Sequence, residues 1–331
     1  MRPKALFILN RPSFEQIYGP DERADIAALV DVYAPPQTKE SIAANPAILE
    51  PCEVIFSGWG APCMDAAFLK AAPTLRAVFY GAGSVKGMVT DALWERGVVV
   101  TSSWGANGIP VTEYALSQIL FSLKLGWRYA AAVRREGRYP TRWSVPGAYG
   151  STVAIISLGM IGRLLCERLR PFDLKLIAYD PFASAAAATA LGVRLCPLAE
   201  CFAQADVVSL HTPWLPETEK MIRGEHFRAM KQDATFINTA RGAVVDEPAM
   251  IEVLQARPDL TAILDVTYPE PPKPGSPLYT LPNVVLTPHI AGSMNAECRR
   301  MGRYAVEECR RFLNGESLQW QVTRERAATL A

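Results

Sequence analysis

The chain has 331 residues, of which half are apolar and a fifth are charged, and its formal net charge is +1 at pH 7. This length exceeds one average domain, so the sequence predicts two domains of an ordinary globular protein. The balanced charge offers no electrostatic footprint for nucleic acid or an anionic membrane. No apolar run approaches the roughly 18 to 20 residues of a membrane span. The first ten residues have too short an apolar core for a signal peptide, so we expect a cytoplasmic protein.

The cysteines do not form a recognisable pattern. There are seven of them, an odd number, and they lie scattered on apolar segments without any C-x-x-C pair. The sequence therefore predicts neither a disulfide framework nor a zinc site, and we expect reduced thiols and no metal.

Residues 1–104 alternate strand-like and helix-like segments. Val54–Ser57 and Ala77–Tyr80 are apolar runs typical of buried parallel strands, and the first ten residues and 98–101 predict two more. The run at Ala77–Tyr80 ends in a turn of small residues, 81–84. This part of the chain is predicted to form a small α/β domain.

A long helix is predicted to begin at 107–110, because Pro110 suits the first turn of a helix. An apolar stripe with helical spacing follows, formed by Val111, Ala115, Ile119 and Leu123. Residues 126–150, rich in tryptophan, arginine and glycine, are predicted to be irregular, as a subunit arm or a loop over a cleft.

From residue 151 onward the alternation of strands and helices is strong. Six strands are predicted, at 153–156, 176–179, 207–210, 235–238, 262–266 and 284–286. Helical segments separate most of them, including an alanine-rich one at 183–190, and a final helix is expected at about 293–314. Such crossovers indicate a doubly wound parallel sheet.

The first of these strands leads into a glycine turn and a helix. The turn reads S-x-G-x-x-G, one glycine short of the dinucleotide-binding fingerprint. Gly159 and Gly162 can let the backbone approach a pyrophosphate at the start of the helix, where negative charge is favoured. Ser157 replaces the first glycine, and we expect the turn to tolerate it if the turn does not demand a positive φ.

An acidic residue follows the next strand. Asp180 ends the strand at 175–179, about 18 residues after Gly162. A carboxylate at this place accepts hydrogen bonds from the adenosine ribose and repels a 2′-phosphate, which favours NAD over NADP. The alternative is that Asp180 only caps the turn before Pro181.

Three residues near the end of the chain, Arg241, Glu270 and His289, each follow an apolar β-like run. A guanidinium can clamp an anion, an imidazole can move a proton, and a carboxylate can fix the imidazole tautomer. Together they predict chemistry on a small anionic carbonyl compound. Each residue alone has an ordinary alternative as a surface ion pair, a loop carboxylate or a packing histidine.

With these motifs the chain resembles the D-isomer-specific 2-hydroxyacid dehydrogenases, such as phosphoglycerate dehydrogenase and glyoxylate/hydroxypyruvate reductase. The matching pieces are S-L-G-M-I-G at 157–162, V-V-S-L-H-T-P at 207–213, N-T-A-R-G at 238–242, D-V-T-Y-P-E-P at 265–271 and T-P-H-I-A-G at 287–292. The resemblance implies an α/β protein with a Rossmann-type doubly wound sheet and a smaller flavodoxin-like domain. It implies a substrate domain of 1–104 plus 294–331 and an NAD-binding domain of 105–293, with no C-terminal regulatory domain.

The resemblance also implies the roles of individual residues. Arg241 would bind the substrate carboxylate and carbonyl, His289 would be the general acid or base, and Glu270 would orient the imidazole. The backbone amides of Ala82 and Gly83 would hold the substrate carboxylate. Cofactor-binding positions are implied at Thr112, Gly159, Met160, Ile161, Gly162, Asp180, His211, Thr212, Pro213, Thr239, Ala240, Asp265 and Gly292.

The implied reaction is a reversible hydride transfer between NADH and a small 2-keto acid, giving a D-2-hydroxy acid, in a homodimer formed with help from the long helix. Met160 stands where relatives often have an arginine for the pyrophosphate. An NAD-sensing protein like the C-terminal-binding-protein corepressors, and oxidation of formate or phosphite on the same fold, remain alternatives. Of the other histidines, His211 follows a strand without a matching carboxylate, and His226 is expected at the surface of a polar helix. No residue identifies the side chain of the acid.

Overall fold

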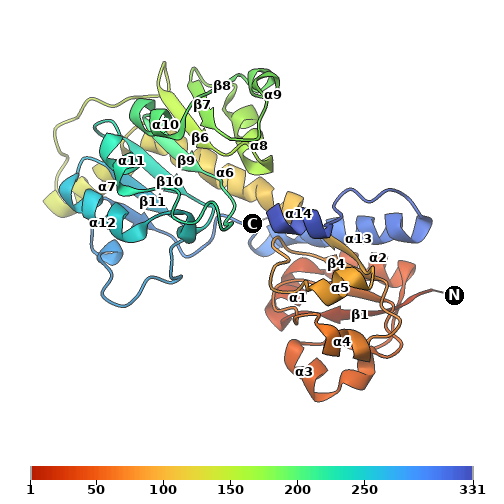
Figure 1. Cartoon of the computed structure of the whole chain (residues 1–331). Helices are drawn as coiled ribbons and strands as arrows, with labels where there is room; N and C mark the ends of the chain where they lie inside the picture. The colour runs from red at the N-terminus through yellow and green to blue at the C-terminus, as the bar shows by residue number, and fades with distance from the viewer. Residues whose placement is uncertain (1, 330–331) are drawn as a thin grey trace. The chain divides into compact units, whose positions relative to one another are not determined.

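The computed structural model describes residues 2–329 (Figure 1). These residues divide into two compact units. One contains the chain up to Gly108 together with the segment from Ser293, and the other contains Ile109–Gly292. Each unit is built on one parallel sheet with helices around it, which confirms the predicted α/β class.

The first unit contains a five-stranded sheet in the order β2-β1-β3-β4-β5, which is the flavodoxin-like arrangement. Its strands are β1 (Lys4–Ile8), β2 (Asp31–Val32), β3 (Val54–Ser57), β4 (Ala77–Tyr80) and β5 (Val99–Ser102). Its helices are α1 (Arg11–Ile17), α2 (Pro20–Leu29), α3 (Lys39–Ala44), η1 (Pro46–Leu49), α4 (Ala66–Ala71), α5 (Asp91–Glu95), η4 (Asn295–Glu297), α13 (Cys298–Asn314) and α14 (Arg324–Thr329).

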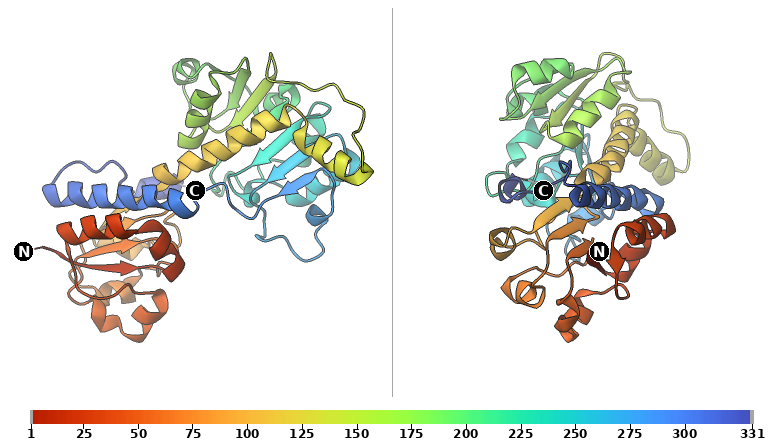
Figure 2. Two further views of the ribbon diagram at one scale, coloured as in Figure 1. Left: turned by 180° about the vertical axis from the view of Figure 1, so that it is seen from behind. Right: turned by 90° about the vertical axis from the view of Figure 1, so that its right-hand side faces the viewer.

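Helix α13, drawn in blue in Figure 2, lies beside the N-terminal helices although it comes from the other end of the chain. It packs on α1 and α2 because Gly302 lacks a side chain, since a Cβ there would lie 2.0 Å from the carbonyl oxygen of Ile17. Arg303 adds an ion pair to the largely buried Glu22 at 3.1 Å. Helix α13 therefore belongs to the core of the first unit.

The second unit contains a seven-stranded sheet in the order β12-β11-β10-β9-β6-β7-β8. Its strands are β6 (Thr152–Ile156), β7 (Lys175–Tyr179), β8 (Val193–Leu195), β9 (Val207–Leu210), β10 (Thr235–Asn238), β11 (Thr261–Leu264) and β12 (Val284–Leu286). The strand order reverses between β6 and β9, and such a switch point is where open α/β sheets bind ligands. The six predicted strands are present, and β8 was not predicted because only one of its three residues, Val193, is buried.

The remaining helices are α6 (Trp104–Ser122), α7 (Gly126–Glu136), α8 (Met160–Leu169), α9 (Ala185–Ala190), α10 (Leu198–Gln204), α11 (Gly224–Ala229), η2 (Gly242–Val244), α12 (Glu247–Ala256) and η3 (Pro277–Tyr279). Two predictions are corrected here. Helix α6 begins at Trp104, so Pro110 lies inside it rather than in the first turn. Helix α7 occupies a segment predicted to be irregular, because its alanines and arginines favour a helix. Only residues 137–150 of that segment lack regular structure.

Among residues 2–329, no helix is long and apolar enough to cross a membrane. The same residues contain no group of three or more His, Cys, Asp or Glu side chains that could hold a metal ion.

Candidate functional site

The glycine turn after β6 has a strained residue at its centre. Ser157 has φ of 76°, in the left-handed region that glycine adopts most readily. The turn therefore does demand a positive φ, so the condition under which we expected it to tolerate a serine is not met. The Ser157 hydroxyl lies 2.8 Å from the hydroxyl of Thr212, and its N–H donates to Tyr179 O at 2.8 Å. These contacts hold the serine in place.

The two glycines of this turn have different surroundings. A Cβ on Gly162 would lie 2.1 Å from the carbonyl oxygen of Ser157, so glycine is required for α8 to pack against the strand. A Cβ on Gly159 would meet no atom within 4 Å. Gly159 thus leaves open space beside the N-terminus of α8, which fits the close approach of a pyrophosphate.

Asp180 caps two segments of backbone. One carboxylate oxygen accepts the N–H of Leu158 at 2.7 Å, which fixes the glycine turn. The other accepts the N–H groups of Phe182 and Ala183 at 2.8 and 2.9 Å. The turn-capping alternative is therefore present in the structure. A carboxylate has about four acceptor positions, so capacity remains for a ribose hydroxyl.

The loops after β9 and β10 contain two polar atoms with unused hydrogen-bonding capacity. The Nε2 of His211 lies 2.9 Å from the Ser209 hydroxyl, while its Nδ1 is buried and has no partner within residues 2–329. The buried hydroxyl of Thr239 also lacks a partner there. Such buried groups normally find a partner, so both fit a polar cofactor at this edge of the sheet. Burial lowers the pKa of His211 to about 4 and keeps the imidazole neutral.

Arg241 is presented by a tight turn after β10. The buried Asn238 side chain accepts the N–H of Ala240 at 2.9 Å and donates to Arg241 O at 3.2 Å. Gly242 lets this turn touch the next loop, because a Cβ there would lie 2.0 Å from the carbonyl carbon of Thr267. Burial lowers the pKa of Arg241, and the nearby Glu270 carboxylate opposes this shift.

His289 and Glu270 form a pair. The Nδ1 of His289 lies 2.7 Å from Oε1 of Glu270, and both side chains are about half exposed. A carboxylate on Nδ1 leaves Nε2 as the nitrogen available for proton transfer. His289 has φ of 54°, another left-handed backbone, and its N–H donates to Asp265 O and Thr287 O, both at 3.0 Å.

Asp265 positions the loop that carries His289. Its buried carboxylate accepts the Thr287 hydroxyl at 2.6 Å and the N–H groups of Ile290 and Ala291, both at 2.9 Å. The hydroxyl of Tyr114 lies 2.8 Å from that of Thr287. The sequence did not indicate this supporting role. The one sign of it in the sequence is that Asp265 and the His289 loop, about 25 residues apart, follow two strands that pair in parallel.

The other predicted site residues are distributed over both units. Thr112 is fully buried in α6, Met160 and Ile161 begin α8, and Pro213 and Gly292 lie in half-buried loops. Ala82 and Gly83 lie in the first unit after β4, where their carbonyls accept the Ser102 hydroxyl. His226 corrects the surface prediction, because it is buried in the first turn of α11 and its Nδ1 accepts the Arg223 N–H at 2.9 Å.

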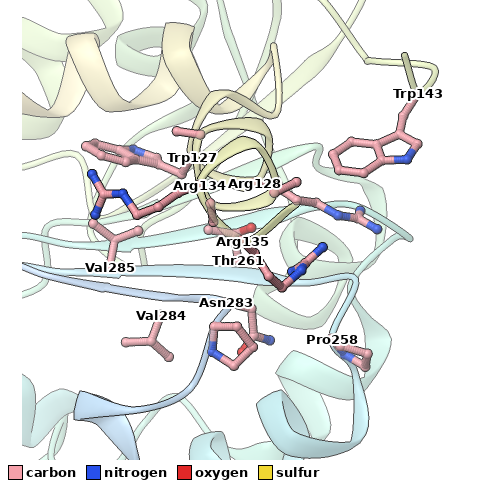
Figure 3. Close-up of a pocket in the computed structure, with 14 residues that line it drawn as sticks. Trp127, Arg128, Arg134, Arg135, Trp143, Pro258, Thr261, Asn283, Val284 and Val285 are labelled. Atoms are coloured by element: carbon pink, nitrogen blue, oxygen red, sulfur yellow. The ribbon is translucent and has the colours of Figure 1, made fainter. Parts of the chain in front are cut away.

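A pocket of about 580 Å³ also lies in the second unit, away from these residues (Figure 3). Helix α7 and the strand β12 line it, and Trp127, Arg134, Trp143 and Val285 are among the side chains around it. None of Arg241, Glu270 and His289 contributes to this pocket. It is therefore a separate feature from the candidate active site.

Comparison with known proteins identifies the class that this fold and site define. Residues 117–291 match the family D-isomer specific 2-hydroxyacid dehydrogenase, NAD binding domain. The chain belongs to this family, and NAD is the cofactor of the matched domain.

Individual relatives agree with that assignment. The chain is 32% identical to D-3-phosphoglycerate dehydrogenase from Archaeoglobus fulgidus over 74% of its own length and 46% of that protein. It therefore spans about half the length of the phosphoglycerate dehydrogenases that it matches. It is 32% identical to glyoxylate reductase from Korarchaeum cryptofilum, over 86% of its own length and 85% of that protein. The apo form of D-mandelate dehydrogenase from Rhodotorula graminis has a similar structure, with a TM-score of 0.82, 25% identity and 98% of each chain covered.

Proposed function

We propose that this protein is an NAD-dependent D-2-hydroxyacid dehydrogenase, which reversibly reduces a small 2-keto acid to a D-2-hydroxy acid. The observation that carries the proposal is the His289–Glu270 pair at 2.7 Å, on a strand-end edge that also carries Arg241. An acid–base pair beside a guanidinium suits a substrate with both a carboxylate and a carbonyl group. The match to the D-isomer specific 2-hydroxyacid dehydrogenase family also supports the proposal.

The residues divide the work of carbonyl reduction. The planar guanidinium of Arg241 binds the carboxylate and the carbonyl oxygen in a fork geometry. NADH, when bound, supplies the hydride. His289 donates its Nε2 proton to the carbonyl oxygen as negative charge grows there, and Glu270 stabilises the imidazolium and fixes its tautomer. In the oxidation direction the neutral imidazole accepts the proton from the hydroxyl.

The two units have separate tasks in this proposal. The unit that contains the seven-stranded sheet holds the cofactor through the glycine turn, Asp180 and the loops after β9, β10 and β11. The unit that contains the five-stranded sheet binds substrate, with the backbone amides of Ala82 and Gly83 holding its carboxylate. Asp265 faces the cofactor while it supports the His289 loop. The domain limits of 1–104 plus 294–331 and 105–293 belong to this proposal.

The decisive experiment is oxidation of NADH by the purified protein against a panel of 2-keto acids. Glyoxylate, hydroxypyruvate, pyruvate, 2-ketoisocaproate and phenylpyruvate cover small, polar, branched and aromatic side chains, and each is repeated with NADPH. We expect turnover with at least one acid, a preference for NADH because of Asp180, and a D-configured product. The His289→Gln variant is the matched control, because glutamine keeps a polar side chain but cannot carry the proton.

Two outcomes would overturn the proposal. NADH binding without turnover on any acid favours an NAD-sensing protein. Turnover on formate or phosphite, but not on keto acids, favours a dehydrogenase that oxidises another small anion on the same fold. Full activity of the His289→Gln variant contradicts the role given to His289.

The proposal includes a cytoplasmic homodimer. Support comes from the surface of α6 and α7, where the Phe121 side chain is 44% exposed. Its ring packs edge-on against that of Trp127, with the ring centroids 5.1 Å apart. The pocket of Figure 3 continues this surface to the edge strand β12. A second copy that covers this area would bury apolar side chains and a free sheet edge. Light scattering on the purified protein measures the mass, and a monomer at micromolar concentration contradicts this part.

A further inference from the structure

Two thiols lie in contact at the start of α10. Cys196 directly follows β8, Pro197 precedes the helix, and Cys201 is the fourth helical residue. Positions before the N-cap and in the first turn commonly pack against each other as a hydrophobic staple. Here both positions are cysteine, and their Sγ atoms lie 3.3 Å apart. The helix fixes this approach, because the N–H of Cys201 donates to Pro197 O at 3.1 Å.

We propose that Cys196 and Cys201 are a redox-sensitive thiol pair, which a hydroperoxide converts into an intramolecular disulfide and a dithiol reductant converts back into two thiols. The distance between the Sγ atoms must shorten by roughly an ångström to reach a bond of about 2.05 Å. Pro197 and the first turn of α10 bring the two residues close before any oxidation. The thiol pair is independent of the proposed dehydrogenase function, because its oxidation is measured on the thiols and not on turnover.

The two cysteines take different roles in the reaction. Cys196 is partly exposed, so it meets the oxidant first, whereas Cys201 is fully buried. Burial raises the pKa of Cys201, and the neighbouring Cys196 raises it further, so Cys201 stays a thiol at neutral pH. A thiol held this way is a poor target for the oxidant but is well placed to resolve an oxidised neighbour.

The steps balance without any other reactant. The Cys196 sulfur attacks the O–O bond of the hydroperoxide, forms a sulfenic acid and releases an alcohol, or water if the oxidant is hydrogen peroxide. The Cys201 sulfur then displaces the hydroxyl group from Cys196 and forms the S–S bond. The proton of Cys201 leaves with that hydroxyl as water. The two thiols lose two electrons in total, and the peroxide oxygen gains them.

The position of the pair gives the modification a structural meaning. The N–H of Cys196 donates to Ala178 O at 2.9 Å, so Cys196 extends the pairing of β8 with β7. Asp180 follows β7 at the same edge of the sheet. A disulfide would tie the loop between β8 and α10 to the helix at this edge. The alternative is that both thiols only pack as small apolar groups, as free cysteines commonly do.

Peptide mapping after oxidation separates these readings. Trypsin releases residues 195–220 as one peptide, in which Cys196 and Cys201 are the only cysteines. The folded protein is treated with hydrogen peroxide in a Cys63→Ser background, because Cys63 is exposed and would form mixed products. We expect this peptide to become lighter by two hydrogens, to resist alkylation and to regain both thiols after treatment with dithiothreitol.

Single variants assign the roles. Cys201→Ser is expected to leave a sulfenic acid on Cys196 that dimedone traps, and Cys196→Ser is expected to leave Cys201 reduced. If serine at the buried position prevents folding, Cys201→Ala tests the same step, and the Cys63→Ser parent already tests disulfide formation. The proposal is overturned if peroxide, at a dose that oxidises Cys63 in the unmodified chain, leaves both thiols alkylatable. Oxidation of Cys196 to a sulfinic acid with Cys201 intact overturns it equally.

Discussion

Two loops at the same edge of the seven-stranded sheet hold a non-glycine residue in a left-handed backbone. Ser157 follows β6 with φ of 76°, and His289 follows β12 with φ of 54°. A left-handed backbone costs a residue with a side chain roughly 1–2 kcal/mol. The side chains use that conformation differently, because Ser157 contacts the Thr212 hydroxyl while His289 contacts the Glu270 carboxylate. In the proposed mechanism the strained backbone at His289 serves proton transfer, whereas at Ser157 a glycine would adopt the same backbone without strain.

The loops also differ in what holds them. The His289 loop is fixed by the buried Asp265, which accepts three hydrogen bonds from it. The turn at Ser157 is fixed by Asp180 through Leu158 N and by the close packing of Gly162. Both loops therefore depend on an aspartate that follows a neighbouring strand, and the turn at Ser157 depends in addition on the absence of a side chain at Gly162. Substitutions in the two loops should therefore separate stability from activity.

The largest effect is expected from His289→Gly. Turnover of the best keto acid should fall at least about 100-fold, since positioned acid–base groups contribute that much or more. The free energy of unfolding should stay equal or rise by up to about 1 kcal/mol, because glycine adopts the left-handed backbone freely. Measurements are kcat with saturating NADH and urea unfolding of the same preparation. Loss of stability in parallel with activity would mean that His289 serves the fold.

The two glycines of the cofactor turn give the next contrast. Gly162→Ala places a Cβ against the Ser157 carbonyl, so we expect a loss of about 3 kcal/mol in unfolding free energy. Gly159→Ala meets open space and has an ordinary φ of −66°, so its stability should remain within about 0.5 kcal/mol. NADH affinity, measured by fluorescence titration, should fall in Gly159→Ala although the fold is intact. Unchanged NADH affinity in that variant would contradict the placement of the pyrophosphate at this turn.

The sequence predicted the strands of both sheets better than it predicted the loops. Strands such as Val207–Leu210 and Thr235–Asn238 are fully buried, so the apolar runs in the sequence mark where these strands begin and end. Strand β8 was missed because two of its three residues are not buried. Pro110 was misplaced because α6 begins six residues earlier, and nothing in the local pattern outweighs the preference of proline for a first turn.

The site shows a similar limit. Arg241, Glu270 and His289 could be singled out because each ends an apolar run, and the structure shows the contact between the last two. The positive φ of Ser157 could not be predicted, because residues with a side chain rarely adopt this region and the residue type gives no sign of it. The buried position of His226 depends on a contact with Phe202 from another helix, with ring centroids 5.1 Å apart. Residue type and spacing identify such groups but do not give their tertiary partners.

A pH-dependent stability term is expected from the loop after β9. Burial lowers the pKa of His211 from 6.5 to about 4, so the unfolded chain binds the extra proton between these values. Stability is therefore full above pH 6.5 and is lost as pH falls toward 4, by about 2 kcal/mol at pH 5. Urea unfolding at pH 7 and pH 5 should show this loss in the wild type and less of it in His211→Gln. His226 is present in both proteins and cancels, so an equal loss in the two would contradict the assignment.

The smallest effect, and the direct counterpart of His289→Gly, is Ser157→Gly. Glycine removes the left-handed strain at the cost of the contact with the Thr212 hydroxyl, so we expect a net gain of about 1 kcal/mol in unfolding free energy. Turnover and the Michaelis constant for keto acid should stay within about twofold, because Ser157 contacts neither Glu270 nor His289. Thr212→Val in the same assay measures the hydroxyl contact alone. If Ser157→Gly lowers stability by as much as Thr212→Val, the contact outweighs the strain, and the two left-handed residues are both retained for what their side chains bind.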